Sequence, residues 1–397
     1  MLKILKSIFE KKHSHIQSKS LKKLHIALYF GGSMENIYQL TQWLPILVEL
    51  EKKERIEFIV RDAQVYFWLQ SKTKIASVFC QKLSDLTKVY EENNFKCILY
   101  VNHGFKNFQS LMHRHALHIH INHGESEKIS TISNQVNAYN YVFIVGDAAF
   151  NKYKFNLLKR NMNTFISIGR PQLEHIKMHQ MRLPKDKKII LYAPTWEGTH
   201  TSMNYTSLNQ YGLEIVNHII NNSDFYLIYK PHPNTGSRDS TTNKINQNIL
   251  KVLQKNNNGH SILDTDINSI FTHVDIGIFD NSAAAIDYLY FDKPIIMTDM
   301  FHRDTHRQCK PTITQAVHLL SSANLTHLTT IINNEIIHDP LQKVRNNAKK
   351  YFLGNYDYSQ NESTTRFISS ILNICKERDT LILKLQKMNN KVHLDDL

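Results

Sequence analysis

The sequence predicts an α/β protein of two consecutive domains, each built on a parallel sheet. The chain has 397 residues, of which 42% are hydrophobic, so it is too long for one small core. Short apolar runs alternate with stretches of helical periodicity, and this series starts again near residue 188. Two facing Rossmann-like domains follow from this pattern. Ligands of such sheets bind at the carboxyl ends of the strands, so the cleft between the domains is the expected site.

The N-terminal domain is assigned to residues 24–170. It opens with an apolar run, 24–30, which is followed by Gly31 and Gly32 and then by helical periodicity over 36–50. This strand–glycine–helix order is typical of a doubly wound domain. Further strands are expected at 56–60, 97–101, 117–121, 141–145 and 165–168.

The C-terminal domain is assigned to residues 171–360. Its strands are expected at 189–192, 226–229, 276–279 and 295–297. The polar stretches 198–205 and 234–243 are interpreted as loops. Residues 361–397 are interpreted as a closing segment, with an amphipathic helix over 361–378 and a charged tail after it.

Residues 1–23 form a basic, amphipathic segment that precedes the first domain. Its basic residues are Lys3, Lys6, Lys11, Lys12, Lys19, Lys22 and Lys23, with Leu2, Ile4, Leu5, Ile8 and Phe9 between them. At helical spacing this pattern suits the surface of an anionic membrane. A solvated, frayed terminus is an equally good interpretation of the same pattern.

The composition limits which cellular compartment and which binding partners are possible. No apolar run is long enough for a transmembrane helix, and the N-terminus is too charged for a signal peptide. Four scattered cysteines favour a reducing cytoplasm over a disulfide framework or a zinc site: Cys80, Cys97, Cys309 and Cys375. The net charge of +13 indicates an anionic partner, either nucleic acid, anionic lipid or a polyanionic substrate. No RNA-binding aromatic motif or zinc finger is present, so nucleic acid ranks below the others.

Two histidines stand at the ends of expected strands. His123 follows the strand 117–121 and is followed by Gly124 and, further on, Lys128. A neutral imidazole is the usual general base near pH 7, whereas a hydrogen-bonded loop histidine is the plainer alternative. His103 competes with it for this role. His232 lies between two prolines, which restrain its backbone, and beside Lys230, so an imidazolium could neutralise a diphosphate there.

Two further strand ends carry groups suited to phosphate. Thr195 and Trp196 follow the strand 189–192, where a hydroxyl could donate to a phosphate and an indole could wall a base. After the strand 276–279 come Asp280, Ser282, Ala283 and Asp287. Ser282 is a suitable N-cap, and the small residues after it would let an anion approach the start of a helix. An ordinary strand-end turn and an ordinary capped helix are the alternatives.

Together these pieces resemble one family over roughly residues 24–370. The motifs that carry the resemblance occur in the order His123-Gly124 with Lys128, Gly169-Arg170-Pro171, Ala193-Pro194-Thr195-Trp196, His232-Pro233, Asp280-Asn281-Ser282 with Asp287, and Lys293-Pro294. This order resembles the CDP-glycerol glycerophosphotransferases of teichoic acid and capsule synthesis. The resemblance implies a GT-B-like fold. It also implies transfer of an alditol phosphate from a CDP-alditol to a hydroxyl of a surface polymer or its lipid-linked precursor, with release of CMP.

The resemblance also implies roles for the candidate residues. His123 would deprotonate the acceptor hydroxyl, and His232 would steady the diphosphate and the departing CMP. The donor would be held by Thr195, Lys230, Asp280, Ser282, Ala283 and Asp287, with Lys128, Arg170, Trp196 and Arg366 as further candidates. No metal or other cofactor is expected. The family has Tyr and then two Ser after its Asp, where this chain has Asn281, Ser282 and Ala283, so the donor alditol stays open between glycerol, ribitol and another alditol.

The expected enzyme is cytoplasmic and peripheral on the inner face of the cell membrane, which it would contact through residues 1–23. A nucleotide-sugar glycosyltransferase with the same fold is the nearest alternative function. It would use the same cleft but release a nucleoside diphosphate. A basic nucleic-acid-binding protein and a non-catalytic membrane scaffold are more distant alternatives.

Overall fold

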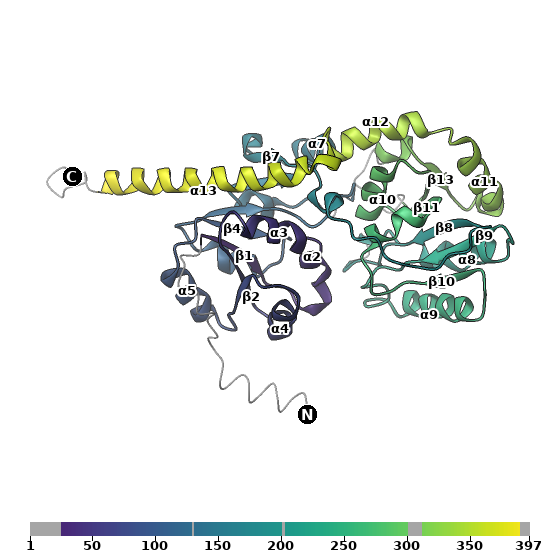
Figure 1. Cartoon of the computed structure of the whole chain (residues 1–397), viewed down its shortest axis with the longest axis horizontal. Coiled ribbons are helices and arrows are strands. Elements are labelled where there is room, and N and C mark those ends of the chain that lie inside the picture. Colours follow the sequence, from purple (N-terminus) through teal and green to yellow (C-terminus); the bar gives the residue numbers. More distant parts are fainter. Residues whose placement is uncertain (1–24, 129–130, 201–202, 301–311, 390–397) are drawn as a thin grey trace, which may run out of the picture.

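The computed structural model describes residues 25–128, 131–200, 203–300 and 312–389. These residues form two α/β domains that lie side by side, each with one parallel sheet and helices on its faces (Figure 1). The predicted two-domain α/β architecture is confirmed.

The N-terminal sheet has seven parallel strands in the order β3-β2-β1-β4-β5-β6-β7. They are β1 (Ile26–Phe30), β2 (Ile56–Val60), β3 (Ala76–Phe79), β4 (Cys97–Tyr100), β5 (Leu117–His120), β6 (Tyr141–Ile144) and β7 (Phe165–Ser167). Six of these strands coincide with predicted apolar runs. Sequence reasoning missed β3, because this edge strand is short and pairs only with β2.

Helices on the two faces of this sheet are α2 (Tyr38–Thr41), α3 (Leu44–Glu51), α4 (Ala63–Lys72), α5 (Leu83–Glu92), α6 (Asn107–Leu111) and α7 (Asp147–Asn156). The helix predicted over 36–50 occurs as a 3-10 turn followed by α2 and α3. Pro45 explains the break, because proline lacks an N–H and is tolerated only in the first turn of a new helix.

The C-terminal sheet has six parallel strands in the order β10-β9-β8-β11-β12-β13. They are β8 (Lys188–Ala193), β9 (Phe225–Tyr229), β10 (Gly259–Ser261), β11 (Ile276–Phe279), β12 (Ile295–Thr298) and β13 (His318–Leu320). The four central strands were predicted. The two edge strands were not, because each has only three residues.

The helices of this domain are α8 (Leu213–Ile220), α9 (Ser240–Gln254), α10 (Ala283–Tyr288), α11 (Leu328–His338) and α12 (Gln342–Leu353). The loop predicted over 234–243 is shorter than expected. Helix α9 begins within it, because the Asp239 side chain accepts hydrogen bonds from the backbone N–H groups of Thr241 and Thr242.

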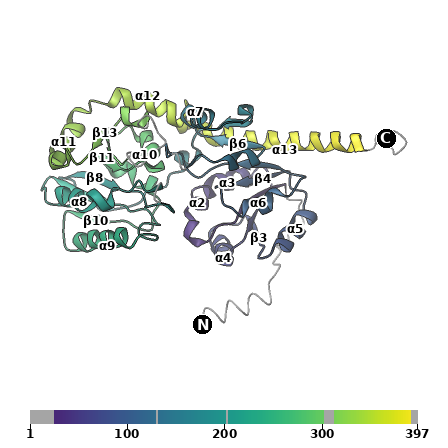
Figure 2. The ribbon, with the colours of Figure 1, turned by 180° about the vertical axis from the view of Figure 1, so that it is seen from behind.

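The chain then returns to the N-terminal domain in one long helix, α13 (Glu362–Asn389), which runs across both views (Figures 1 and 2). Phe367, Ile371 and Ile374 of this helix are part of the hydrophobic core of the N-terminal domain. The predicted charged tail from 379 is therefore wrong up to residue 389. The apolar spacing continues through Leu381 and Leu385, so the helix does not end at the charged cluster before them.

Three of the four cysteines lie in the described residues and are buried free thiols. The sulfur atoms of Cys97 and Cys375 are 3.2 Å apart, at the contact of β4 with α13. Cys309 and the basic segment 1–23 lie outside the described residues. Within the part of the chain that the structure describes, no helix has the length and apolarity needed to cross a membrane.

Candidate functional site

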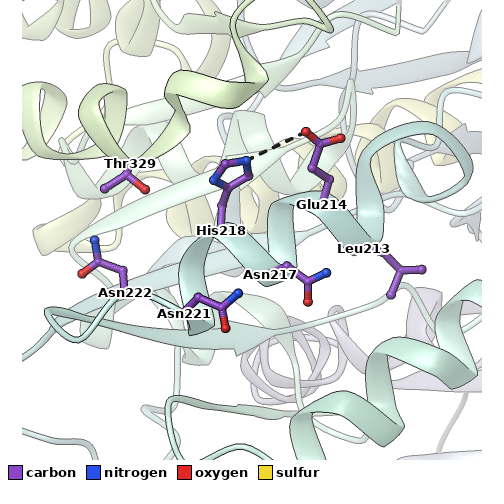
Figure 3. A pocket seen from close by; sticks show the side chains of 7 residues that line it. All are labelled: Leu213, Glu214, Asn217, His218, Asn221, Asn222 and Thr329. Atoms are coloured by element: carbon purple, nitrogen blue, oxygen red, sulfur yellow. Dashed lines mark ion pairs between the residues drawn. The ribbon is translucent and has the colours of Figure 1, made fainter.

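The strand ends of the two sheets border a cleft of about 680 Å³ between the domains. Residues directly after β4, β5, β8, β9 and β11 line it, as the predicted site requires. A second hollow, of about 590 Å³, lies between α8 and the start of α11 (Figure 3). Three of its seven lining side chains are amides, and its one ion pair joins His218 to Glu214 at 3.9 Å. We place the functional site in the inter-domain cleft, where titratable groups from both domains converge.

His123 is held in one orientation and one tautomer. Asn122 before it has a φ of +57°, a left-handed conformation that asparagine tolerates, and its carbonyl accepts a hydrogen bond from Trp43 Nε1 at 2.6 Å. The ring Nδ1 of His123 lies 2.8 Å from the carbonyl oxygen of Val101. Because a carbonyl only accepts, Nδ1 carries the proton and Nε2 keeps its lone pair. Burial lowers the pKa of His123, so the ring is a neutral base near pH 7.

His232 has the opposite tautomer. Its Nδ1 accepts a hydrogen bond from the backbone N–H of Asn234 at 3.1 Å, so in the neutral ring the proton is on Nε2. Burial lowers the pKa of His232 to about 3, and the nearby Lys128, Lys230 and His123 add to this shift. The predicted imidazolium is therefore wrong. His232 is a neutral hydrogen-bond donor, and the Trp196 indole stacks on it at 5.8 Å.

Tyr38, at the start of α2, stands between the two histidines. Its ring meets His123 edge-on at a centroid distance of 5.9 Å and His232 at 5.4 Å. The N-terminal domain thus contributes a ring that touches the catalytic candidates of both domains. Sequence reasoning missed Tyr38, because its segment shows only the periodicity of an amphipathic helix.

Lys128 reaches across the cleft from the N-terminal domain. Its Nζ donates to Thr195 Oγ1 at 2.9 Å and lies 5.3 Å from the centre of the Tyr205 ring. Burial lowers the pKa of Lys128 to about 8, and the charge of Asp280 opposes this effect. On the other wall, Lys230 Nζ donates to the carbonyl of Leu263 at 2.9 Å, and burial lowers its pKa as well.

Asp280 was predicted to contact the donor, and the structure corrects this. Its carboxylate is fully buried, does not line the cleft, and accepts from Thr195 N–H at 2.7 Å, Ser207 N–H at 3.2 Å and Thr298 Oγ1 at 2.6 Å. Three hydrogen-bond donors satisfy most of the acceptor capacity of a buried carboxylate. Asp280 therefore shapes the turn that presents Thr195, instead of binding a ligand itself.

Ser282 and Ala283 do line the cleft. Ser282 is at the predicted N-cap position of α10, but its side chain makes no capping hydrogen bond. The buried Ser282 Oγ has no hydrogen-bond partner among the described residues, so it can meet a ligand. A methyl group on Gly124 would lie 2.9 Å from the Ala283 Cβ, so glycine is needed where the two domains approach each other.

Arg170 and Asp287 form a buried ion pair at the junction of the domains. Arg170 Nε and Nη2 donate to the two Asp287 oxygens at 3.0 Å each, and Nη2 also donates to the His123 carbonyl at 3.1 Å. The Asp287 carboxylate is thus paired with a guanidinium. Both side chains are buried and both line the cleft, so the predicted contact of Asp287 with the nucleoside stays a prediction.

Arg366, the last candidate, lies away from the cleft. Its exposed guanidinium donates to the Ser167 carbonyl at 2.7 Å and lies 5.6 Å from the centre of the Tyr356 ring. The cleft-lining residues do not include it. The predicted donor contact of Arg366 is therefore wrong, because α13 places this residue on an outer face.

Two acidic residues that sequence reasoning missed hold the loops of the site. Glu197 accepts from the backbone N–H groups of Gly236, Arg238 and Asp239, and so fixes the loop after His232. Glu125 pairs with Lys152 at 2.7 Å and accepts from the Asn122 side chain at 3.2 Å, beside His123. In the sequence, Glu125 and Glu197 are recognisable only as acidic residues close to a candidate motif. Without the fold, this closeness does not indicate which loop each of them holds.

His103, the competitor of His123, also lines the cleft. Its ring stacks on that of His120 at a centroid distance of 4.0 Å, and burial lowers its pKa to about 4. Asp266, of the Asp-Thr-Asp stretch, accepts from the backbone N–H of Asn268 at 2.8 Å, as expected for a loop residue. Among the described residues, no three His, Cys, Asp or Glu side chains are grouped so as to hold a metal ion.

Two Rossmann-like domains that face each other across a cleft define a GT-B-like fold. The sequence profile of the CDP-glycerol:poly(glycerophosphate) glycerophosphotransferase family matches residues 36–313, and the chain belongs to this family. It is accordingly an enzyme of the CDP-glycerol glycerophosphotransferase type. Membership in this family sets aside the glycosyltransferase, scaffold and nucleic-acid-binding alternatives.

Solved structures show the same fold at low sequence identity. A variant of the wall teichoic acid polymerase TagF superposes with a TM-score of 0.58 at 14% identity, covering 90% of each chain. A UDP-N-acetylglucosamine 2-epimerase from Listeria monocytogenes gives 0.57 at 14% identity, over 90% of this chain and 98% of the other. The Neisseria meningitidis epimerase bound to UDP-GlcNAc gives 0.57 at 14%, over 89% and 100%. A comparison with curated proteins found no match.

We predict that the Arg170–Asp287 pair is strongly coupled. Arg170→Met and Asp287→Asn should each lower the free energy of unfolding by about 3–5 kcal/mol, because each leaves one buried charge without a partner. The double variant should lose far less than the sum. Urea unfolding of the four proteins measures the coupling. Glu49→Gln, which breaks an exposed pair with Lys52, is the control and should cost less than about 1 kcal/mol. Additive effects at positions 170 and 287 would contradict the prediction.

Proposed function

We propose that this enzyme transfers glycerol phosphate from CDP-glycerol to a hydroxyl of a teichoic acid or capsule polymer, or of its lipid-linked precursor, and releases CMP. One observation carries the proposal. The two cleft histidines are fixed by backbone contacts in opposite tautomers, so that His123 offers a lone pair and His232 offers a proton on its outward nitrogen. Such a pair suits a reaction in which one oxygen loses a proton while another gains negative charge.

The reaction then runs as an in-line displacement at the phosphorus that carries the glycerol. The acceptor oxygen forms a bond to this phosphorus while its proton moves to Nε2 of His123. The bond from the phosphorus to the bridging oxygen breaks, and CMP leaves with the electron pair. His232 donates a hydrogen bond from Nε2 to the phosphate oxygens on which charge develops. Phosphoryl transfer depends mainly on such alignment and charge stabilisation.

The donor diphosphate is proposed to lie between the lysines and the Ser282 hydroxyl. Lys128 and Lys230 border the cleft from opposite domains, and Thr195 lies beside Lys128. Burial lowers the pKa of both lysines, and a bound dianion would raise the pKa of each. The proposal assigns charge neutralisation to these side chains, with no metal or other cofactor.

The donor alcohol is proposed to be glycerol, with ribitol as the alternative. Support for glycerol comes from the family to which the chain belongs. The ribitol alternative rests on the stretch after Asp280, where the only hydroxyl is that of Ser282. Asn281 beside it is buried, and its Nδ2 has no hydrogen-bond partner among the described residues.

The proposed location is the cytoplasmic face of the cell membrane. A lipid-linked acceptor would be presented there, and the lysine-rich segment 1–23 would attract the enzyme to anionic headgroups. The scattered cysteines, three of which are buried free thiols, suit a reducing compartment.

The test of this function is a donor panel. The purified protein is incubated with CDP-glycerol, CDP-ribitol or a nucleotide sugar, together with crude membrane acceptor, and the released nucleotide is identified. We expect CMP, and CDP-glycerol to be the faster of the two CDP-alditols. Release of a nucleoside diphosphate from a nucleotide sugar would contradict the proposal.

Alanine substitutions of the two histidines should affect kcat and donor affinity differently. His123→Ala should lower kcat by about 10²–10⁴-fold with donor affinity unchanged, because a base acts on the acceptor. His232→Ala should lower kcat by about 10²–10³-fold, the usual cost of losing one donor to developing charge, and should also weaken CDP-glycerol binding. Steady-state rates and calorimetric titration with CDP-glycerol separate the two effects. His218→Ala is the control, because His218 lines the second hollow and not the inter-domain cleft (Figure 3). A pure loss of donor affinity in His123→Ala would argue against its role as base.

The pH profile of kcat/KM should be bell-shaped. Activity should fall as the pH drops through the pKa of His123, which burial holds below the usual 6.5, because the protonated ring cannot accept the acceptor proton. Activity should also fall as the pH rises through about 8, where Lys128 loses its charge. Lys128→Arg should shift the alkaline limb upward, because arginine stays protonated. An alkaline limb that stays in place in this variant would exclude Lys128 as its source.

A further inference from the structure

A pair of stacked histidines belongs to the N-terminal wall of the cleft and has no role in the chemistry proposed above. His103 lies in the loop after β4 and lines the cleft, and His120, the last residue of β5, is almost fully buried against it. The two rings are nearly parallel, with an interplanar angle of 9° and centroids 4.0 Å apart. The Tyr139 ring packs on both, at 5.9 Å from His103 and 5.1 Å from His120.

The hydrogen-bonding groups of this histidine pair are unused within the protein. Neither ring nitrogen of His103 and neither of His120 has a hydrogen-bond partner among the described residues, although all four atoms are buried. A neutral imidazole has one donor and one acceptor, and a buried polar group without a partner is destabilising. Two such rings on the wall of a functional cleft therefore indicate that a ligand supplies the partner.

The polar side chains next to His103 are already engaged with one another. Asn102 Nδ2 donates to Gln39 Oε1 at 2.6 Å. Asn107 Nδ2 donates to the Asn102 carbonyl at 2.6 Å and to the Tyr139 hydroxyl at 3.0 Å. These bonds hold the loop after β4 in one conformation, so His103 is presented to the cleft from a fixed backbone.

His103 also lies close to the proposed base. The carbonyl of Val101, two residues before His103, is the group that holds Nδ1 of His123 at 2.8 Å. The two rings are near enough for the charge of His123 to contribute to the lowered pKa of His103. An acceptor whose attacking hydroxyl reaches His123 would therefore bring its neighbouring atoms to His103.

The chemical group that suits this wall is a hydroxyl. Burial is the main cause that lowers the pKa of His103 to about 4 and also lowers that of His120, so both rings are neutral near pH 7. Lys152, whose charge acts on both rings, is paired with Glu125 at 2.7 Å. A neutral ring beside a paired cation attracts a phosphate weakly, whereas a hydroxyl donates and accepts hydrogen bonds as a neutral imidazole does.

We propose that His103, supported by His120, binds a second hydroxyl of the acceptor, beside the hydroxyl that attacks the donor. The side chains of Asn36, Ser133 and Gln135 line the N-terminal part of the same cleft and offer further polar contacts. His103 would thus select an acceptor end with two hydroxyls, from glycerol or from a sugar, over one that leaves its ring without a partner. The inference rests on the proposed function, because it takes an acceptor hydroxyl as the nucleophile.

The test compares acceptors that differ by one hydroxyl. The full chain is given CDP-glycerol with a soluble phosphodiester that ends in glycerol, or with its analogue that ends in propane-1,3-diol, and CMP release is measured. A methyl hexoside and its monodeoxy analogues form a second arm, which distinguishes a sugar end from a glycerol end. The native chain should prefer the acceptor with the second hydroxyl by about tenfold in kcat/KM, because the analogue leaves the ring unpaired.

Substitutions of His103 should change this preference. His103→Phe keeps the ring stack but removes both nitrogens, so it should slow only the acceptor with the second hydroxyl, while calorimetric affinity for CDP-glycerol stays native. His103→Gln provides one donor and one acceptor again and should recover part of the preference. His113→Phe is the matched control, because His113 is also half-buried and stacked, on Tyr90 at 4.7 Å, but does not line the cleft.

Two kinetic outcomes would overturn the proposal. Equal slowing of both acceptors of a pair in His103→Phe would show that this ring contacts another part of the acceptor or only packs. Native-like preference in the same variant would show that another group reads the second hydroxyl.

Binding is measured separately, by NMR of the isotope-labelled histidine rings. The glycerol-ended phosphodiester should shift the ring signals of His103, and the propanediol analogue should shift them less. These shifts without CMP release from any pair would refute the proposed function and leave the hydroxyl site standing. CMP release without the shifts would refute the hydroxyl site alone, and the absence of both would refute both.

Discussion

The geometry of the cleft depends on one guanidinium. Arg170 follows the last strand of the N-terminal sheet, and it contacts Asp287 of α10 and the carbonyl of His123 at the same time. Its backbone N–H donates to Tyr358, in the segment that leads into α13. A buried charge is stable only with its partners in place, so these contacts set how His123 of one domain lies against α10 of the other.

The cleft contains two histidines with different hydrogen-bonding roles, because different backbone groups face the two rings. A carbonyl faces Nδ1 of His123 and an amide faces Nδ1 of His232, so one outward nitrogen accepts and the other donates. Burial keeps both rings neutral by lowering the pKa of each. Tyr38 separates the rings and holds them at similar distances. No pair of charged groups is needed to define which histidine is the base.

The strands and the two histidines could be predicted because their signals are local: an apolar run, and a polar side chain directly after it. Asp280 and Arg366 were misassigned because their roles depend on partners 85 and 199 positions away in the chain. Tyr38 and Glu197 were missed for the same reason, since nothing near them in the sequence shows what they face. The helical residues 379–389 were taken for a tail because charges precede them, whereas the apolar spacing continues.

The electrostatics of the cleft suit a dianion. Lys128 and Lys230 are held where burial lowers their pKa, and His232 is neutral for the same reason and because the lysines are close. The two ammonium groups donate to neutral acceptors, the Thr195 hydroxyl and the Leu263 carbonyl. The charges of Asp280 near Lys128 and of Asp266 and Asp264 near Lys230 oppose the lowering of the pKa only in part. A diphosphate would add negative charge beside both lysines. In the proposed reaction these contacts would grow stronger as the bridging oxygen gains charge, so the groups proposed to bind the donor would also favour its cleavage.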